Sequence, residues 1–416
     1  MVRTIIPSCV SGSIKAPSSK SMTQRAIAAA VLADGETTVM NPSYCDDSLA
    51  AITIATGLGA DIEKLPGKIH ISGSSGIKEN ILNCGESGLA IRMFSPIASL
   101  FPSEITLSGT GSLRKRPMSM IEEALRQLGV TCRSEGGYLP LTVRGPMRGG
   151  SCEIDGSISS QLLTGLLMAL PVIQSDSMVK VYNLKSRPYI DMTIQVLEKF
   201  GINVVNEAYS GFTIRGNQKY KSCSFEVEGD WSGSAFLLVA GAVAGDVTVY
   251  GLRPDSRQSD KAILSALDKS GAKMSISDDS VRVSQSELNA FEFDATESPD
   301  LFPPLAALAS YCRGTSVIMG VSRLIHKESN RASALVEEFD KMKIRIEIRG
   351  NKMFITGGRI SGAQVNSHGD HRIAMAAAAA ALGALDKVVI NDSQCIAKSY
   401  PGFFEDLKKL GALVEE

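Results

Sequence analysis

Basic side chains recur beside predicted helix starts in this chain of 416 residues. A helix N-terminus has unpaired N–H groups and a partial positive charge, so it attracts anions. Cations buried at such ends would be costly unless anionic partners accompanied them. Small molecules that carry phosphate and carboxylate groups would supply that negative charge. The charged and polar residues at or near these starts are Lys20, Ser21, Arg25, Arg92, Ser159, Ser160, Gln161 and Arg372.

Four more basic residues stand in predicted loops, and two carboxylates lie near them in the sequence. The basic residues are Arg116, Lys327, Arg331 and Lys398, and the carboxylates are Asp300 and Glu328. These residues have structural alternatives. A lone Ser-x-Lys or Arg-Pro is usually a solvated loop or a helix cap, since serine is a favoured N-cap. Lys327 and Arg331 could pair with Glu328 or Glu337 on an exposed helix face, and either carboxylate could be a structural cap or an ion-pair partner. Only their joint occurrence at a repeated spacing favours a binding site.

A repeat of about seventy residues must position these side chains. Five segments read as the end of an amphipathic helix, a glycine and then a short strand. Glycine is the residue expected at the position just after a helix C-terminus. The five glycines are Gly59, Gly129, Gly201, Gly271 and Gly411, and Lys343 takes the place of a sixth.

A second series of strongly apolar helices keeps the same spacing. A helix that is apolar on all sides is buried, so each unit supplies one buried helix, one amphipathic helix and several strands. Their expected starts are near Ala26, Leu89, Leu162, Ala235, Leu305 and Ile373. Six such units fit two α/β domains of three units each.

The domain boundary is expected near Glu228. We expect residues 1–17 plus 229–416 to form one domain and 18–228 the other. The last unit ends abruptly at Glu416 and needs a closing strand, so the strand before Pro17 would pair with the later domain. Two chain crossings of this kind make a good hinge.

Composition excludes several classes of protein. Lysine and arginine number 43 against 44 aspartates and glutamates, which argues against a protein that coats nucleic acid or membrane by bulk charge. The eight cysteines lack zinc or redox spacing and the four histidines form no metal-ligand motif. The start lacks a signal peptide's apolar region, so we expect a cytoplasmic protein with reduced thiols. No apolar run is long enough to span a bilayer.

Over essentially its whole length the sequence resembles the 3-phosphoshikimate 1-carboxyvinyltransferase, or EPSP synthase, family of enolpyruvyl transferases. The matching stretches, in the family's order, are 20–25, 85–92, 116–117, 159–161, 186–189, 299–300, 327–331, 370–372 and 397–401. The resemblance implies an inside-out α/β barrel of two domains with six βαβαββ units. It also implies an active site in the cleft between the domains.

The activity that the resemblance implies is transfer of the enolpyruvyl group of phosphoenolpyruvate to the 5-hydroxyl of shikimate 3-phosphate, with release of phosphate. The reaction belongs to the shikimate pathway, which leads to chorismate and the aromatic amino acids, and it proceeds by addition and then elimination. Neither a metal nor an organic cofactor is implied. We expect a monomer whose partners are these two substrates.

Site residues follow from the resemblance position by position. The implied contacts to shikimate 3-phosphate are Ser21, Arg25, Ser159, Ser160, Gln161, Ser186, Asp300 and Lys327. The implied contacts to phosphoenolpyruvate are Lys20, Gly88, Arg92, Arg116, Gln161, Arg331, Arg372 and Lys398. Asp300 resembles the base that takes the hydroxyl proton. Glu328 resembles a proton carrier at the vinyl carbon, and whether it or Lys20 protonates that carbon stays open.

Three positions depart from the family's commonest pattern. Glu86 stands where many members have asparagine, His326 replaces valine, and Arg323 lies where some members have a ligand-contacting asparagine. We therefore leave Glu86 and Arg323 out of the expected site.

Two other functions remain as alternatives. One is enolpyruvyl transfer to UDP-N-acetylglucosamine, whose enzymes carry a reactive cysteine in the loop before their Arg-Pro; residues 109–117 contain no cysteine. The other is a non-catalytic protein that binds anions or nucleic acid on the same fold. Neutral net charge, the lack of basic stretches interleaved with aromatics, and both carboxylates argue against it.

Overall fold

The computed structural model describes residues 1–325 and 327–416, which form two compact units. Unit 1 comprises Met1–Pro17 and Glu228–Glu416, and unit 2 comprises Ser18–Val227. Each unit has its own hydrophobic core. No helix among the described residues is long and apolar enough to cross a membrane.

Unit 2 contains three four-stranded sheets with one pattern of pairing. In each sheet the first pair of neighbours is parallel, and the next two pairs are antiparallel. The first sheet runs β16 (Ser224–Glu226), β4 (Glu36–Met40), β6 (Lys68–Ser72), β5 (Asp61–Leu65). The second runs β7 (Ile81–Asn83), β8 (Glu104–Ser108), β10 (Tyr138–Arg144), β9 (Thr131–Glu135). The third runs β11 (Ser151–Asp155), β12 (Ser177–Tyr182), β14 (Gly211–Ile214), β13 (Val205–Glu207), and a small separate sheet pairs β3 (Ala33–Asp34) with β15 (Tyr220–Lys221).

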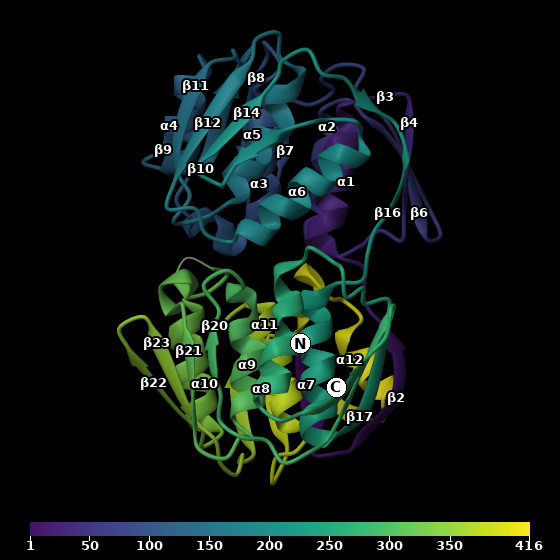
Figure 1. Cartoon of the computed structure of the whole chain (residues 1–416), viewed down its shortest axis with the longest axis vertical. Helices are drawn as coiled ribbons and strands as arrows, with labels where there is room; N and C mark the ends of the chain where they lie inside the picture. Colours follow the sequence, from purple (N-terminus) through teal and green to yellow (C-terminus); the bar gives the residue numbers. More distant parts are fainter. Residues whose placement is uncertain (326) are drawn as a thin grey trace. The chain divides into compact units, whose positions relative to one another are not determined.

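Unit 1 repeats the same pattern, and the start of the chain completes two of its sheets. The predicted pairing of the N-terminal segment with the later part of the chain is confirmed; Figure 1 shows the purple β2 beside β17. One sheet runs β24 (Ala363–Asn366), β25 (Val388–Asn391), β1 (Val2–Ile6), β26 (Leu413–Glu415). Another runs β2 (Val10–Lys15), β17 (Gly245–Tyr250), β19 (Ser280–Ser284), β18 (Lys273–Ile276). The third runs β20 (Glu292–Asp294), β21 (Thr315–Met319), β23 (Lys352–Thr356), β22 (Arg345–Arg349).

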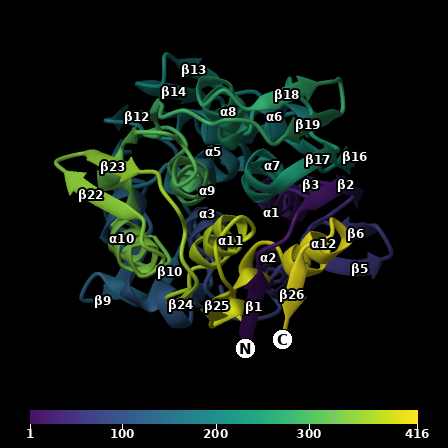
Figure 2. The ribbon, with the colours of Figure 1, turned by 90° about the horizontal axis from the view of Figure 1, so that it is seen from below.

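Six helices are buried along almost their whole length, as predicted. In Figure 2 the three of unit 1 lie at the centre with the sheets around them, and these helices contact one another. Within each unit the buried helices lie inside and the sheets lie outside. The predicted α/β class is confirmed. The buried helices are α1 (Lys20–Val31), α3 (Gly88–Ala98), α5 (Gln161–Ala169), α7 (Trp231–Ala244), α9 (Phe302–Ala309) and α11 (His371–Ala381).

The amphipathic helices and short 3-10 turns lie between these elements. The amphipathic helices are α2 (Asp46–Gly57), α4 (Ser119–Gln127), α6 (Arg187–Lys199), α8 (Ile263–Lys269), α10 (Arg331–Lys341) and α12 (Phe403–Lys409). The 3-10 helices are η1 (Gly111–Lys115), η2 (Leu170–Val172), η3 (Ser259–Ala262), η4 (Pro299–Leu301), η5 (Val321–Leu324) and η6 (Ser393–Lys398).

The predicted start of the first buried helix was wrong by more than a turn. Apolarity placed it near Ala26, but α1 begins at Lys20. The reason is local capping: Ser19 Oγ accepts a hydrogen bond from the N–H of Met22 at 3.4 Å. The polar residues from Lys20 to Arg25 therefore lie on the helix itself.

The repeated glycine position has a backbone cause. All five glycines have left-handed φ angles, from 76° at Gly129 to 103° at Gly59, and Lys343 has φ 66° at the sixth position. A side chain costs roughly 1–2 kcal/mol in this conformation, whereas glycine adopts it freely. Lys343 therefore adopts the conformation of the glycine that it replaces.

Replacing Lys343 with glycine should stabilise unit 1. We expect the free energy of unfolding in urea to rise by about 1 kcal/mol for Lys343→Gly, because the left-handed strain is removed. Gly271→Ala should lower it by a similar amount, since an added Cβ there meets only ordinary contacts and strain alone acts. A Lys343→Gly variant less stable than the wild type would contradict this explanation.

Candidate active site

Gly88 in unit 2 is closely approached by two guanidinium groups. A Cβ atom at Gly88, the first residue of α3, would lie 2.5 Å from Arg116 Nη1 and 2.9 Å from Arg92 Nη1. Arg92 Nη1 also donates to Gln161 Oε1 at 2.9 Å, which ties α3 to the start of α5. Both arginines are buried. Two positive charges and an amide therefore gather at a helix N-terminus, which is the arrangement that binds an anion.

The first turns of α1 carry two more cations with different environments. Lys20 Nζ donates to Asp47 Oδ2 at 2.7 Å and is partly exposed. Arg25 is 1% exposed and donates to Ser21 O at 2.8 Å and to Thr193 Oγ1 at 2.9 Å. Burial lowers the pKa of Arg25 to about 10, so it stays charged at neutral pH. Lys20 is the more accessible of the two to a ligand.

The predicted serines lie at helix starts. Ser160 is the N-cap of α5, and Ser159 Oγ accepts from the N–H of Gln161 at 3.2 Å. Ser186 precedes α6 in a left-handed conformation, with φ 57°. Two of the serines, Ser160 and Ser186, are buried.

A second cluster in unit 1 centres on Arg331, whose side chain has no exposed surface. Arg331 Nη1 donates to Asp300 Oδ1 at 2.8 Å and Nη2 to Glu328 Oε2 at 2.5 Å. Its Nε donates to Asp370 Oδ2 at 2.9 Å. One guanidinium thus joins three carboxylates from three segments. Of the two pairings left open by the sequence, Arg331 makes the one with Glu328.

Of these carboxylates, Asp300 forms ion pairs with the largest number of cations among the described residues. Lys327 Nζ lies 3.1 Å from Asp300 Oδ1, and Arg372 Nη2 lies 3.2 Å from Oδ2. Burial by itself would raise the pKa of Asp300, but the charges of Arg372, Lys327 and Arg331 hold it well below its usual range. For Lys327, burial lowers the pKa although Asp300 opposes the shift. Asp300 is therefore an ionised carboxylate that is only one-fifth exposed.

Asp370 is a member of the cluster that we did not predict. It is fully buried, bonds Arg331, and caps α11 through the N–H of Arg372 at 3.0 Å. Lys398 Nζ donates to Gly369 O, next to it, at 2.8 Å. The available signal was its place two residues before Arg372 in the matching stretch 370–372. Asp47, the partner of Lys20, was also missed and had no such signal.

Of the sixteen predicted site residues, ten belong to unit 2 and six to unit 1. Unit 2 brings Gly88, Arg92, Arg116 and Gln161 together, and unit 1 joins Asp300, Lys327, Glu328, Arg331 and Arg372. The unit 2 residues are Lys20, Ser21, Arg25, Gly88, Arg92, Arg116, Ser159, Ser160, Gln161 and Ser186.

Of the three atypical positions, Glu86 has a clear structural contact. Its carboxylate accepts from the N–H of Ser112 at 2.8 Å, in the loop that leads to Arg116. Arg323 is half-buried on η5, and His326 lies outside the described residues.

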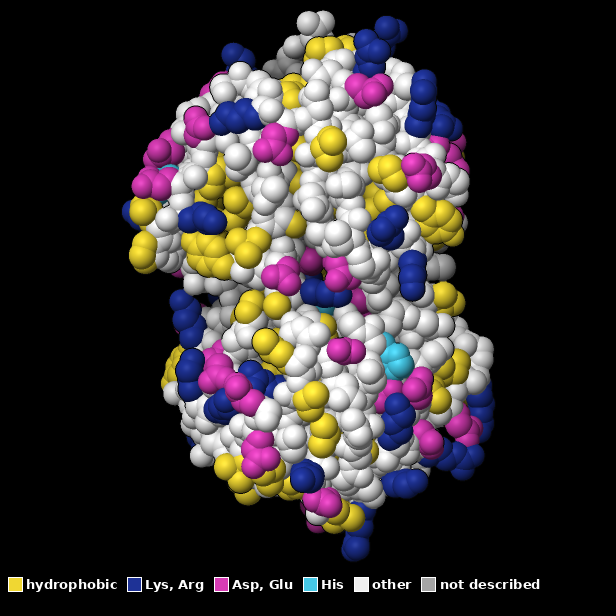
Figure 3. Space-filling model, turned by 180° about the vertical axis from the view of Figure 1, so that it is seen from behind, with side chains coloured by type: hydrophobic (Ala, Val, Ile, Leu, Met, Phe, Trp, Pro, Cys, Tyr) yellow, Lys and Arg dark blue, Asp and Glu magenta, His cyan; other side chains and the backbone are white. Residues whose placement is uncertain are grey.

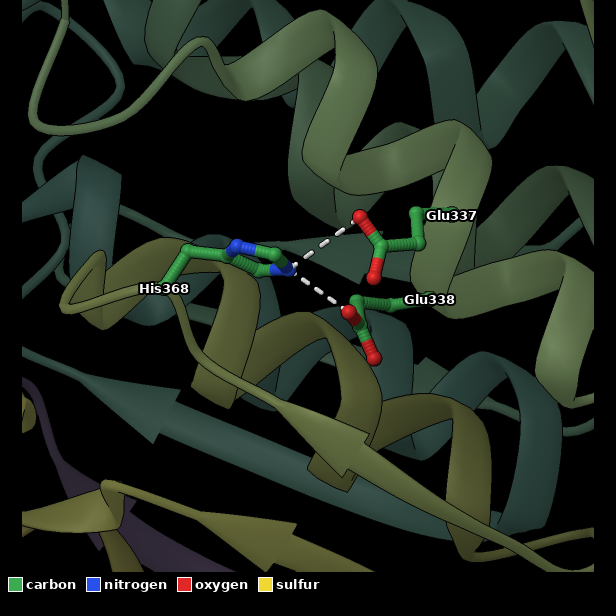
Figure 4. Close-up of side chains that lie close together, drawn as sticks. All are labelled: Glu337, Glu338 and His368. Carbon is green, nitrogen blue, oxygen red and sulfur yellow. Dashed lines mark hydrogen bonds and ion pairs between the residues drawn. The ribbon is translucent and has the colours of Figure 1, made fainter.

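Glu337, Glu338 and His368 are the residues in the described part of the chain whose types could hold a metal ion. Figure 4 shows both glutamates reaching from α10 toward His368 on the loop before α11, and Figure 3 shows a surface histidine among charged side chains. Lys341 Nζ already lies 2.8 and 2.9 Å from the two oxygens of the buried Glu338, and the N–H of Asn366 donates to it. Any metal ion would have to displace Lys341. The group is therefore an ion-paired clamp between α10 and the loop before α11.

Comparison with known proteins shows the family of this chain. The family model for EPSP synthase (3-phosphoshikimate 1-carboxyvinyltransferase) matches residues 5–407. The 3-phosphoshikimate 1-carboxyvinyltransferase of Methanocorpusculum labreanum is 38% identical, over 98% of both chains. That of Clostridium kluyveri is 36% identical, over 99% of this chain and 98% of the relative.

The chain belongs to the EPSP synthase family. The predicted family and enzyme class, a transferase, are thereby confirmed. The structure of an EPSP synthase from Acinetobacter baumannii superimposes with a TM-score of 0.84 at 25% identity and covers all of both chains. The predicted two-domain inside-out barrel is consistent with this neighbour.

Arg331→Met should destabilise unit 1 in a pH-dependent way. The substitution leaves three carboxylates without their shared cation. We therefore expect the free energy of unfolding to fall by about 3–5 kcal/mol at pH 7. The pKa of Asp300 is lower in the folded protein than in the unfolded chain, where it is about 4. The stability that ionised Asp300 contributes is therefore fully present above about pH 4 and is lost as pH falls through the folded-state pKa. The difference in the free energy of unfolding between the wild type and Arg331→Met should therefore shrink below about pH 4, because the carboxylates of the variant become protonated there.

Denaturant unfolding between pH 3 and 8 measures this difference. Arg313→Met is the matched control, because Arg313 pairs with Glu287 at the surface and should contribute under about 1 kcal/mol. A difference for Arg331→Met that is the same at every pH would contradict the proposed charge network.

Proposed function

We propose that this chain transfers the enolpyruvyl group of phosphoenolpyruvate to the 5-hydroxyl of shikimate 3-phosphate, with release of phosphate. Membership of the EPSP synthase family and relatives that carry the transferase name support this reaction. The observation that carries the proposal is the carboxylate Asp300, held among three cations in a partly open cluster. A protein that only bound anions would gain nothing from a carboxylate there.

In this proposal units 1 and 2 are the two domains, and the active site lies between them. Two substrates that carry several negative charges repel each other, so a cation-lined and dry site both neutralises them and stabilises charge shifts in the transition state. Both units offer such cations: Arg92 and Arg116 in one, and Arg331 and Arg372 in the other.

Each substrate receives the residues that the resemblance implied. Ser21, Arg25, Ser159, Ser160, Gln161, Ser186, Asp300 and Lys327 bind shikimate 3-phosphate. Lys20, Gly88, Arg92, Arg116, Gln161, Arg331, Arg372 and Lys398 bind phosphoenolpyruvate. The lack of a side chain at Gly88 supports the second set, because the approach of both guanidiniums needs that space.

In this proposal the residues that transfer protons are Asp300, Glu328 and Lys20. Asp300 is ionised and can accept the hydroxyl proton, and Glu328 lies beside it on the same guanidinium. Lys20 or Glu328 donates the proton to the vinyl carbon. No metal or organic cofactor takes part, and the protein acts in the cytoplasm as a monomer.

Phosphate release tests the proposal directly. Wild-type protein in the presence of chelator should release phosphate when phosphoenolpyruvate and shikimate 3-phosphate are both present, and not with either alone. Release with UDP-N-acetylglucosamine in place of shikimate 3-phosphate, and none with shikimate 3-phosphate, would assign the chain to the rival reaction.

Removing either carboxylate should lower turnover by orders of magnitude while binding of shikimate 3-phosphate persists. For Asp300→Ala and Glu328→Gln we expect kcat to fall by about 10²–10⁴, as loss of acid–base groups does. Equilibrium binding of shikimate 3-phosphate should change far less. Glu337→Gln, a surface glutamate of the neighbouring helix, is the control and should keep full activity. Near-normal kcat in either test variant would remove that residue from the mechanism.

A further inference from the structure

Asp260 is a buried carboxylate in unit 1 that has no part in the proposed acid–base steps. It lies in η3 and is 1% exposed. Its Oδ2 accepts a hydrogen bond from Ser232 Oγ in the first turn of α7. Its other oxygen, Oδ1, is also buried and accepts no hydrogen bond from the described residues. A carboxylate buried with one oxygen unpaired is costly, so its retention needs a reason.

Hydrogen bonds hold the segment of Asp260 between α7 and the loop that leads to Asp300. Ser259 Oγ donates to Glu297 O at 2.7 Å, three residues before Asp300. Gln258 accepts from the N–H of Trp231 at 3.1 Å and donates to Gly229 O at 2.7 Å. The position of Asp260 is therefore set independently of its own charge.

The charged groups around Asp260 come from three elements. They are Asp300 of η4, Arg372 of α11, and Asp230, the N-cap of α7. The fourth packed element, α8, carries its charged residues Asp268 and Lys269 at its exposed end. Burial and then the negative charge of Asp300 raise the pKa of Asp260 to about 6, against the opposing charge of Arg372.

We propose that Asp260 is a positioning residue for the reaction: its negative charge, held by Ser232, offsets the cations around Asp300 and keeps Asp300 basic enough to take a proton. Arg372, Lys327 and Arg331 hold the pKa of Asp300 well below its usual range, although Glu328 on the same guanidinium opposes them. Asp260 is a further carboxylate, and its segment is bonded to the loop before Asp300. Its charge adds to the repulsion from Glu328 and restores part of the affinity of Asp300 for a proton. The inference rests on the proposed function, in which Asp300 is the base.

The test is the pH dependence of kcat in Asp260→Asn. This variant keeps the shape and an acceptor for Ser232 but has no charge. At pH 8 we expect about tenfold slower phosphate release than in the wild type, because Asp300 is then a weaker base. Near pH 5 the two rates should converge, because the wild-type Asp260 is itself protonated and neutral there.

Controls separate this role from a structural one. Asp255→Asn, an exposed carboxylate five residues away, should match the wild type at every pH. Ser232→Ala removes the hydrogen bond that favours ionised Asp260, so the acid limb of the wild-type profile should move to higher pH while the rate at pH 9 stays high. This second variant carries the test if Asp260→Asn does not fold.

The outcomes are distinct. A constant ratio of wild-type to Asp260→Asn rates at all pH values, or an unmoved acid limb in Ser232→Ala, would overturn the role of Asp260. An inactive wild type would instead contradict the proposed function.

Discussion

A buried guanidinium that must be neutralised is the constraint on which the charged cluster of unit 1 depends. Arg331 has no exposed surface and joins Asp300, Glu328 and Asp370. Loss of any partner would leave charge unpaired in a low-dielectric interior, which is strongly unfavourable. The turn of Glu328 and the starts of α9 and α11 therefore hold one another in place, and Asp300 is fixed before any ligand arrives.

The repeated unit explains why so many charged groups can lie near helix ends. Each seventy-residue repeat buries one apolar helix behind a four-stranded sheet. The unpaired N–H groups at the start of that helix must therefore find hydrogen-bond partners. Ser19, Ser87, Asp230 and Asp370 cap four of these helices. Where the helix begins with glycine, as at Gly88, side chains from other segments can reach the N-terminus itself.

Local patterns in the sequence predicted the framework well and the partners of the cations poorly. The spacing of the glycines and the apolar helices predicted six units, and even the exception, Lys343, has the left-handed conformation of the glycines. Apolarity misjudged the start of α1, because it does not register a serine cap. Asp47 pairs with Lys20 across 27 residues and gave no local signal.

What the sequence by itself determined is the order of helices and strands and the residue types available for catalysis, because apolar periodicity and turn chemistry act over a few neighbouring residues. Only the tertiary structure decided which carboxylate meets which cation. Asp300, Arg331 and Asp370 are spread over seventy residues, and their pairing depends on the folding of three helices around one core. Charge interactions depend on distance and burial, and neither is a property of the sequence alone.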